Sequence, residues 1–354
     1  MKKLITSVTL LFLFCVPAWA ETKPQVTGTS PIEVSITDGI QPAINRILKE
    51  NSGDVWIAYA VPSISSEHQS CCSNESFGCC GACSLDDHKG CAIKRTNPQQ
   101  GSATLASFVE IFLKFQRTQL RQVRMFSPDC VIDAAGMTVY WLNGVKDDQS
   151  VAYLSQLIDS DVSSRSDVNG LIAAIAFHSD PTAGSLLGSL LQPEKNINIR
   201  NQSAFWIGNT RGSHGLDVLL GALATDHDGE FLNHVVFAIS QSSEQQRALN
   251  ELVRLARSDP RQRVREQALF WLAQQAGKKA ASTITDAIEN DSDTEVKKKA
   301  VFALSQMPKD ESIPLLIDQA KRNKNPVVRK EAIFWLGQSG DPRALDFIWS
   351  VLTE

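Results

Sequence analysis

The sequence has no excess of basic residues and, beyond its first twenty positions, no long apolar run. Lysine and arginine number 35 against 39 aspartates and glutamates among 354 residues, which gives a formal net charge of −4. A mildly acidic chain lacks the positive field with which proteins bind nucleic acid or anionic membranes. No later segment approaches the roughly 20 apolar residues of a transmembrane helix. We therefore expect neither a nucleic-acid partner nor a membrane span.

Catalytic and cofactor signatures are also missing. The sequence contains no serine elbow, phosphate-binding loop or dinucleotide fingerprint. Its six histidines are scattered, and no two have the i, i+4 spacing of metal ligands on a helix. Asp129 and Asp133 flank Cys130 and could form a carboxylate pair, but a turn explains them more simply. We expect a protein that is not an enzyme and has no cofactor.

The first residues have the pattern of a secretory signal peptide. Lys2 and Lys3 precede an apolar run from Leu4 to Val16, and Ala18-Trp19-Ala20 places small residues where a signal peptidase requires them. We expect cleavage after Ala20, so that residues 1–20 are removed, and export, most simply to a bacterial periplasm. Loss of the two lysines would move the net charge to about −6.

The second half of the sequence repeats itself about every 32 residues. Apolar residues at offsets 0, 4, 7 and 8 of each copy fall on one face of a helix. A second amphipathic stretch, such as 215–224, 248–256 or 313–320, lies between copies. Two helices per unit predict an α-solenoid of about six helix pairs over residues 148–354. The copies are IRNQSAFWI from residue 199, FLNHVVFAI from 231, VREQALFWL from 264, VKKKAVFAL from 296, VRKEAIFWL from 328 and a weaker VNGLIAAIA from 168.

These copies resemble the second helix of a HEAT repeat and the shorter HEAT-like units named after phycobilisome lyases. The pattern is Val-Arg followed by an apolar residue and later a leucine, as from Val264 to Leu272. The resemblance covers about residues 149–354 and extends to exported bacterial HEAT-repeat proteins of unknown function. It implies the fold, and it leaves the function open because HEAT arrays serve many roles. A bilin-lyase role is not expected, since no cysteine or histidine cluster falls within the repeats.

The resemblance also implies a polar ladder between successive repeats, built from an acidic or amide residue before each copy and a basic residue inside it. Leucine stands at position 232, where a basic residue is implied, so we expect a weak ladder there. The implied members are Glu194, Asp226, Asp259, Asp291 and Asn323 on the first side, and Arg200, Arg265, Lys297 and Arg329 on the second.

A phenylalanine recurs at offset 6 of each copy, near the edge of the expected buried face. The rings could pack between neighbouring repeats, or they could form a partly exposed row along the concave groove that binds an extended or helical peptide. Tryptophans follow in alternate copies, at Trp206, Trp271 and Trp335, and are expected to point into the core. The phenylalanines, our candidates for partner binding, are Phe205, Phe237, Phe270, Phe302 and Phe334.

The first half has a different pattern. Residues 21–31 are polar and predict a flexible start, and residues 32–147 predict a small mixed β domain of about four strands. A polar, cysteine-rich insertion, 65–102, separates the first two strands. The expected elements are a helix at 40–51 and strands at 54–64, 107–116, 120–127 and 137–145. Together with the solenoid this makes the fold class α+β.

Seven cysteines remain after removal of the signal peptide, and in an oxidising compartment they indicate disulfides first. The insertion has few large apolar residues, so cross-links would supply the stability that burial cannot. Seven is odd; any one of the seven can be left out and the other six paired in 15 ways, which gives 105 possible arrangements. The disulfide candidates are Cys71, Cys72, Cys79, Cys80, Cys83, Cys91 and Cys130.

Two alternatives for this cluster remain open. Cys80 and Cys83 have the spacing of a zinc knuckle, and His68, His88 or neighbouring cysteines could complete four ligands. The same Cys-Gly-Ala-Cys resembles a thioredoxin-type redox motif, although glycines around it favour a loop. We expect an exported scaffold whose groove binds a protein or peptide in the cell envelope; the alternative is a metal-binding or thiol-redox protein acting through Cys71–Cys91.

Overall fold

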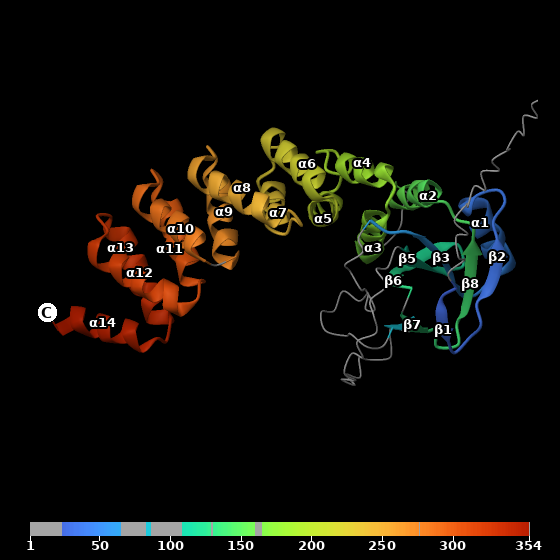
Figure 1. The fold of residues 1–354 in the computed structure, drawn as a ribbon, viewed down its shortest axis with the longest axis horizontal. Helices are drawn as coiled ribbons and strands as arrows, with labels where there is room; N and C mark the ends of the chain where they lie inside the picture. The colour runs from blue at the N-terminus through green and yellow to red at the C-terminus, as the bar shows by residue number, and fades with distance from the viewer. Residues whose placement is uncertain are drawn as a thin grey trace, which may run out of the picture.

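The computed structural model describes residues 23–64, 83–85, 108–128, 130–159, 165–275 and 277–353. Figure 1 shows a β region from which a row of paired helices extends as an arch, with the C-terminus at its far end. Among the described helices, none combines the length and apolarity that a membrane crossing requires.

A five-stranded sheet forms the centre of the β region, in the order β2-β8-β3-β5-β6. β2 and β8 run parallel, as do β8 and β3, whereas β3-β5 and β5-β6 are antiparallel. The predicted helix and four strands are confirmed, and β2 is a fifth strand that the sequence pattern did not reveal. The elements are β2 (Ile32–Ser35), α1 (Ile40–Glu50), β3 (Asp54–Pro62), β5 (Phe108–Gln116), β6 (Gln119–Phe126) and β8 (Thr138–Asn143).

A second, smaller sheet consists of β1 (Gln25–Thr27), β7 (Val131–Asp133) and β4 (Cys83–Ser84), all parallel, with β7 in the centre. The expectation of a flexible start at 21–31 is therefore wrong for β1. This strand is ordered because it pairs with β7 and because the half-buried Val26 packs against a hydrophobic cluster.

The central sheet is covered on both faces. Alternate residues of β3 separate into two sets, since successive side chains of a strand point to opposite sides. Ile57 and Tyr59 join the core that continues into the helices. Trp56 joins a second cluster with Phe112 and Trp141, next to the small sheet. The β region is thus joined to the arch by one continuous apolar core.

Beyond the sheet, the helices alternate between two rows. The five strong sequence copies fall in α5, α7, α9, α11 and α13, and the weak copy falls in α3, so the predicted repeat of helix pairs is confirmed. The bounds are α2 (Asp147–Asp159), α3 (Arg165–Phe177), α4 (Pro181–Ser189), α5 (Ile197–Thr210), α6 (Gly212–Thr225), α7 (Gly229–Ser240), α8 (Gln245–Ser258), α9 (Gln262–Gln275), α10 (Lys278–Asn290), α11 (Thr294–Ser305), α12 (Lys309–Arg322), α13 (Pro326–Gln338) and α14 (Pro342–Thr353).

The odd-numbered helices from α3 to α13 form one row of the arch, which we call the inner row. α3, α5, α7, α9, α11 and α13 each pack directly against the next member of this row. Figure 1 shows α5, α7, α9 and α11 along the underside of the arch, with α4, α6, α8 and α10 above them. We call the surface formed by the inner-row residues that face away from the core, among them Phe205, Phe237, Phe270, Phe302 and Phe334, the inner groove.

Candidate functional site

The polar ladder joins successive repeats at two places. Arg265 donates from Nε and Nη2 to the two oxygens of Asp291, at 2.8 and 3.1 Å, and from Nη1 to the carbonyl of Asp259 at 3.0 Å. Arg200 pairs with Asp226 and also donates to the carbonyl of Leu191 at 2.9 Å. The Arg265–Asp291 pair is bidentate, which fixes the relative position of the two loops that it joins, whereas Arg200 contacts Asp226 through Nη2 alone. The implied ladder is confirmed at these two places.

At Leu232, where the ladder lacks a basic residue, another arginine pairs with the aspartate of the ladder. Asp259, which would face a basic residue at that position, is held instead by Arg261, whose Nε and Nη2 donate at 2.9 Å each. Arg261 also donates to the carbonyl of Leu223 in the preceding unit at 2.6 Å. Burial tends to raise the pKa of Asp259, but the hydrogen bonds and charge of Arg261 outweigh it and lower that pKa.

The remaining ladder positions behave differently from the implied pattern. Lys297 does not pair with Asn323; it donates to the carbonyl of Glu289 at 2.6 Å. Arg329 donates to the main-chain carbonyl of Asn323 at 2.8 Å. At the last loop, hydrogen bonds from Arg343 lower the pKa of Asp341 to about 2.

The recurring aromatic residues form an unbroken row along the inner helices. Phe205 stacks on Phe237 with ring centroids 5.9 Å apart, and Phe270 stacks on Phe302 at 6.2 Å. Tryptophans join these pairs: the Phe237 and Trp271 rings are 4.8 Å apart. The full order is Phe177, Trp206, Phe205, Phe237, Trp271, Phe270, Phe302, Trp335 and Phe334.

The structure shows the phenylalanine rings packed between repeats and partly exposed, and partner binding by them stays a prediction. The rings contact the next repeat, as the packing interpretation required. They are nevertheless half-buried at four positions, and Phe334 is 53% exposed. The three tryptophans are half-buried and pack against the core, as predicted. The phenylalanine row therefore presents apolar surface to the inner groove while it connects neighbouring units.

A row of side-chain amides follows the phenylalanines and was missed in the sequence. Each phenylalanine is followed four residues later by Asn or Gln, which places the amide on the same helix face one turn further on. Four of these amide residues are exposed, and Asn209 is half-buried. The recurring F-x-x-x-[NQ] was the signal that could have found them. The row is Asn209, Gln241, Gln274, Gln306 and Gln338.

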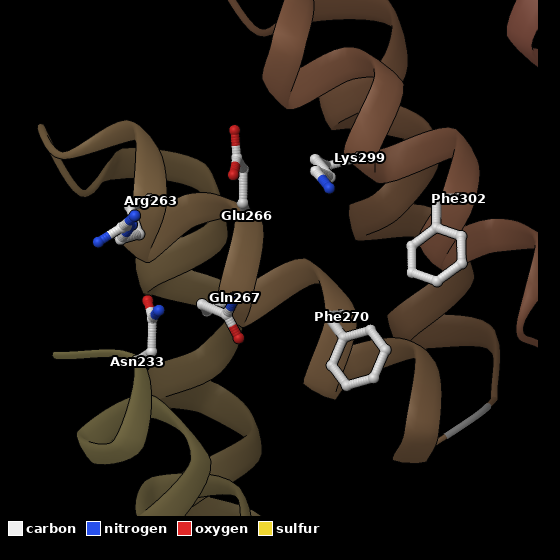
Figure 2. Close-up of a pocket in the computed structure, with 7 residues that line it drawn as sticks. All are labelled: Asn233, Arg263, Glu266, Gln267, Phe270, Lys299 and Phe302. Atoms are coloured by element: carbon white, nitrogen blue, oxygen red, sulfur yellow. The ribbon is translucent and has the colours of Figure 1, made fainter. Parts of the chain in front are cut away.

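A cavity of about 240 Å³ opens on the inner groove between α7, α9 and α11. Phe270 and Phe302 form its apolar side, and polar groups complete the lining: Asn233, Arg263, Glu266, Gln267 and Lys299. Figure 2 shows these side chains projecting from three neighbouring helices. The amide oxygen of Asn233 is buried and has no hydrogen-bond partner among the described residues.

The repeating helix pairs, the arginine ladder and the recurring core pattern agree with one family. A family model described as HEAT repeats matches residues 183–273 and 281–354. These residues are HEAT repeats. HEAT arrays in general act as scaffolds for protein–protein interaction, and the inner groove lies within this part of the chain.

Two solved structures are similar to the HEAT array. Human deoxyhypusine hydroxylase in complex with glycerol is 19% identical over 56% of this chain and 77% of its own, with a TM-score of 0.25. YibA of E. coli is 17% identical over 58% of this chain and 76% of its own, with a TM-score of 0.33. These TM-scores are too low for a comparison of the arches. No curated protein matches the chain significantly.

A buried polar network lies where the β region meets the HEAT array, and sequence reasoning missed it. His178 is fully buried; its Nδ1–H donates to the carbonyl of Ala174 at 2.8 Å, and its Nε2 lies 2.8 Å from the Ser150 hydroxyl. Ser150 is in turn hydrogen-bonded to the Tyr59 hydroxyl of β3 at 2.8 Å. Ser150 is fully buried, and through it the network joins β3 and α2 to His178 after α3.

The cysteine cluster lies almost wholly outside the described residues. Cys130 is 2% exposed and takes part in a disulfide bond. The main chain of Cys83 lies in β4, paired with β7. Outside the described part fall His68, His88, Cys71, Cys72, Cys79, Cys80 and Cys91, so the disulfide pattern and the metal alternative stay predictions. Among the described residues, no three or more His, Cys, Asp or Glu gather as a metal site.

Proposed function

We propose that the protein is an exported interaction scaffold whose inner groove binds a protein or peptide of the cell envelope. The observation that carries this proposal is the phenylalanine row, which repeats through five HEAT units and keeps its rings partly exposed. A ring needed only for packing would stabilise the fold more if it were fully buried, because burial of apolar surface lowers the free energy of the folded state. Aromatic residues are also enriched in protein–protein interfaces relative to the rest of the protein surface.

Export rests on the first twenty residues and on the number of cysteines. The positive start, short apolar run and Ala-x-Ala sequence favour a cleaved signal peptide. A cysteine-rich insertion is consistent with an oxidising compartment such as the periplasm. A partner in the cell envelope would follow from that location.

The Phe270→Ser variant tests the groove. Because the ring is half-buried and touches both Trp271 and Phe302, we expect a loss of about 1–2 kcal/mol in unfolding free energy. We also expect co-purification from the native host to lose the partners that the unaltered protein retains, as measured by quantitative mass spectrometry. The control is Leu352→Ser, which removes a 75% exposed apolar side chain from α14. Equal capture by Phe270→Ser and the unaltered protein would refute the proposal.

The chemical state of the cysteine cluster distinguishes the scaffold function from the metal-binding or thiol-redox alternative. The bonded state of Cys130 favours disulfides. We expect non-reducing peptide mapping of the exported protein to find three fixed bridges, and metal analysis to find no stoichiometric ion. Stoichiometric zinc or copper, or a Cys80–Cys83 pair that is readily reduced, would instead favour a metal-binding or thiol-redox protein.

A further inference from the structure

The inner groove carries a three-residue stripe on each of five helices. The phenylalanine stands in the middle, with one polar residue four positions before it and an amide four positions after it, so all three share a helix face. The stripes read Asn201-Phe205-Asn209, Asn233-Phe237-Gln241, Glu266-Phe270-Gln274, Lys298-Phe302-Gln306 and Lys330-Phe334-Gln338. Polar groups therefore border the phenylalanine row on both sides, and charge appears only in the later units.

The bordering amides have spare hydrogen-bonding capacity. The side-chain oxygens of Asn201 and Asn233 are buried without a partner in the described chain, and Asn201 is only 9% exposed. Within the described ranges, the side chains of Gln274 and Gln338 form no hydrogen bond. A buried amide oxygen without a donor costs free energy, which a ligand N–H would recover.

Side-chain amides of this kind suit an extended backbone. Each amide both donates and accepts, as a peptide group does. An extended segment presents unpaired N–H and C=O groups, whereas a helix has already paired its own. The stacked phenylalanine rings are 5.9 and 6.2 Å apart. Within each of these two pairs the spacing is close to the roughly 6.6–6.8 Å between side chains on one face of an extended chain, and Trp271 lies between the pairs.

The charge at the cavity selects the kind of segment. Arg263 and Lys299 line the cavity, and neither forms an ion pair with another described residue. Glu266 also lines it and accepts a hydrogen bond from Gln262 at 2.8 Å. The lining thus holds two cations and one carboxylate, which leaves a net positive charge beside two aromatic rings. A carboxylate of the ligand would neutralise this remaining positive charge.

We infer that the inner groove binds an extended, acidic peptide segment: the amides hold its backbone, its apolar side chains lie against the phenylalanines, and its carboxylates lie near Arg263 and near Lys299. This inference rests on the proposed function and specifies its partner. The segment would cross the inner helices, with its acidic residues over α9 and α11.

Fluorescence anisotropy with the full protein and labelled twelve-residue peptides tests this inference. The probe alternates leucine with serine and has two of the leucines replaced by aspartate, so that the carboxylates lie on the same face of the extended peptide as the remaining leucines. One matched peptide has lysine in place of both aspartates, and another has the same composition arranged and stapled as an amphipathic helix. We expect the aspartate probe to bind at least about tenfold more tightly than either. The Arg263→Gln/Lys299→Gln variant should remove the preference for aspartate over lysine.

A second variant tests whether the side-chain amides bind the peptide. Gln274→Ala with Gln306→Ala should weaken binding of the aspartate probe by about tenfold, whereas Gln245→Ala on the outer helix α8 should leave it unchanged. Tighter binding of the helical peptide, no preference between aspartate and lysine, or no effect of the amide variant would overturn the inference. If these peptides fail while Phe270-dependent capture succeeds, only the extended acidic ligand is refuted; failure of that capture refutes the scaffold function itself.

Discussion

Replacing Arg200 with methionine is expected to lower the free energy of unfolding by about 3–5 kcal/mol. The Arg200 side chain is 3% exposed, pairs with the buried Asp226 and lies over the Phe231 ring at 3.7 Å from its centroid. Methionine fills much of the same volume but leaves the Asp226 carboxylate buried without its cation. An uncompensated buried charge costs far more than the net contribution of the pair.

Denaturant unfolding of the full protein measures this loss, and Arg247→Met is the matched control. Arg247 also pairs with an aspartate, Asp217, but the two side chains are 40% and 60% exposed. We expect that variant to lose less than about 1 kcal/mol. Adding Asp226→Asn to Arg200→Met should recover part of the loss, because it removes the charge and keeps the oxygen that accepts from the Asp228 N–H. Equal losses for Arg200→Met and Arg247→Met would contradict the buried-pair argument.

The solenoid was predictable because its signal recurs. A single amphipathic helix is ambiguous, but the same apolar offsets returning every 31–33 residues leave stacked pairs as the simplest solution. The ladder was predictable only in part. The implied pattern places each basic residue at the same position of every repeat. At Leu232 that position is apolar, and Arg261, which stands at a different position of the repeat, pairs with Asp259 instead. At Lys297 a basic residue is present, but its partner position holds the neutral Asn323, and the amine goes to a carbonyl instead.

Short strands and long-range contacts were beyond sequence reasoning. β1 and β4 have three and two residues, too few for an alternating pattern, and they exist because β7 lies between them. The junction network brings together Tyr59, Ser150 and His178 from distant parts of the chain. No local pattern marks any of these residues. The amide row, in contrast, was visible in the sequence, but polar residues on a helix surface are so common that it did not stand out beside the aromatic residues.

Acid is expected to weaken the junction through His178. Burial lowers the pKa of His178, with a further contribution from the Arg211 charge, against the opposing effects of Asp147 and Asp180. Arg211 donates to the carbonyl of His178 at 2.9 Å, and Asp147 lies 3.8 Å from Nε2. Burial also raises the pKa of Tyr59, so its hydroxyl stays neutral and gives no charge to compensate a protonated ring.

The direction in which the unfolding free energy changes with pH follows from proton binding to His178. In the unfolded chain His178 takes up a proton as pH falls below about 6.5, whereas the folded protein resists until its lower pKa is reached. Unfolding therefore binds a proton in this window, and the free energy of unfolding should fall by up to about 1.4 kcal/mol per pH unit. The pKa values of Asp259 and Asp341 are lowered in the folded protein. Their contribution to the free energy of unfolding is therefore lost only at more acidic pH, near or below the ordinary pKa of an aspartate. The interval between about pH 5 and 6.5 thus separates the effect of His178 from that of these two aspartates.

Urea unfolding at several pH values across that interval measures the slope for the full protein. His178→Asn is expected to unfold more readily at neutral pH because it loses packing and hydrogen bonds, but its unfolding free energy should depend less on pH. The slope, and not the stability at one pH, therefore carries the test. His227→Asn, at an exposed loop position, should keep the slope of the unaltered protein. An unchanged slope in His178→Asn would show that acid acts elsewhere, because removing the buried imidazole would then have removed no proton-binding site from the unfolding reaction.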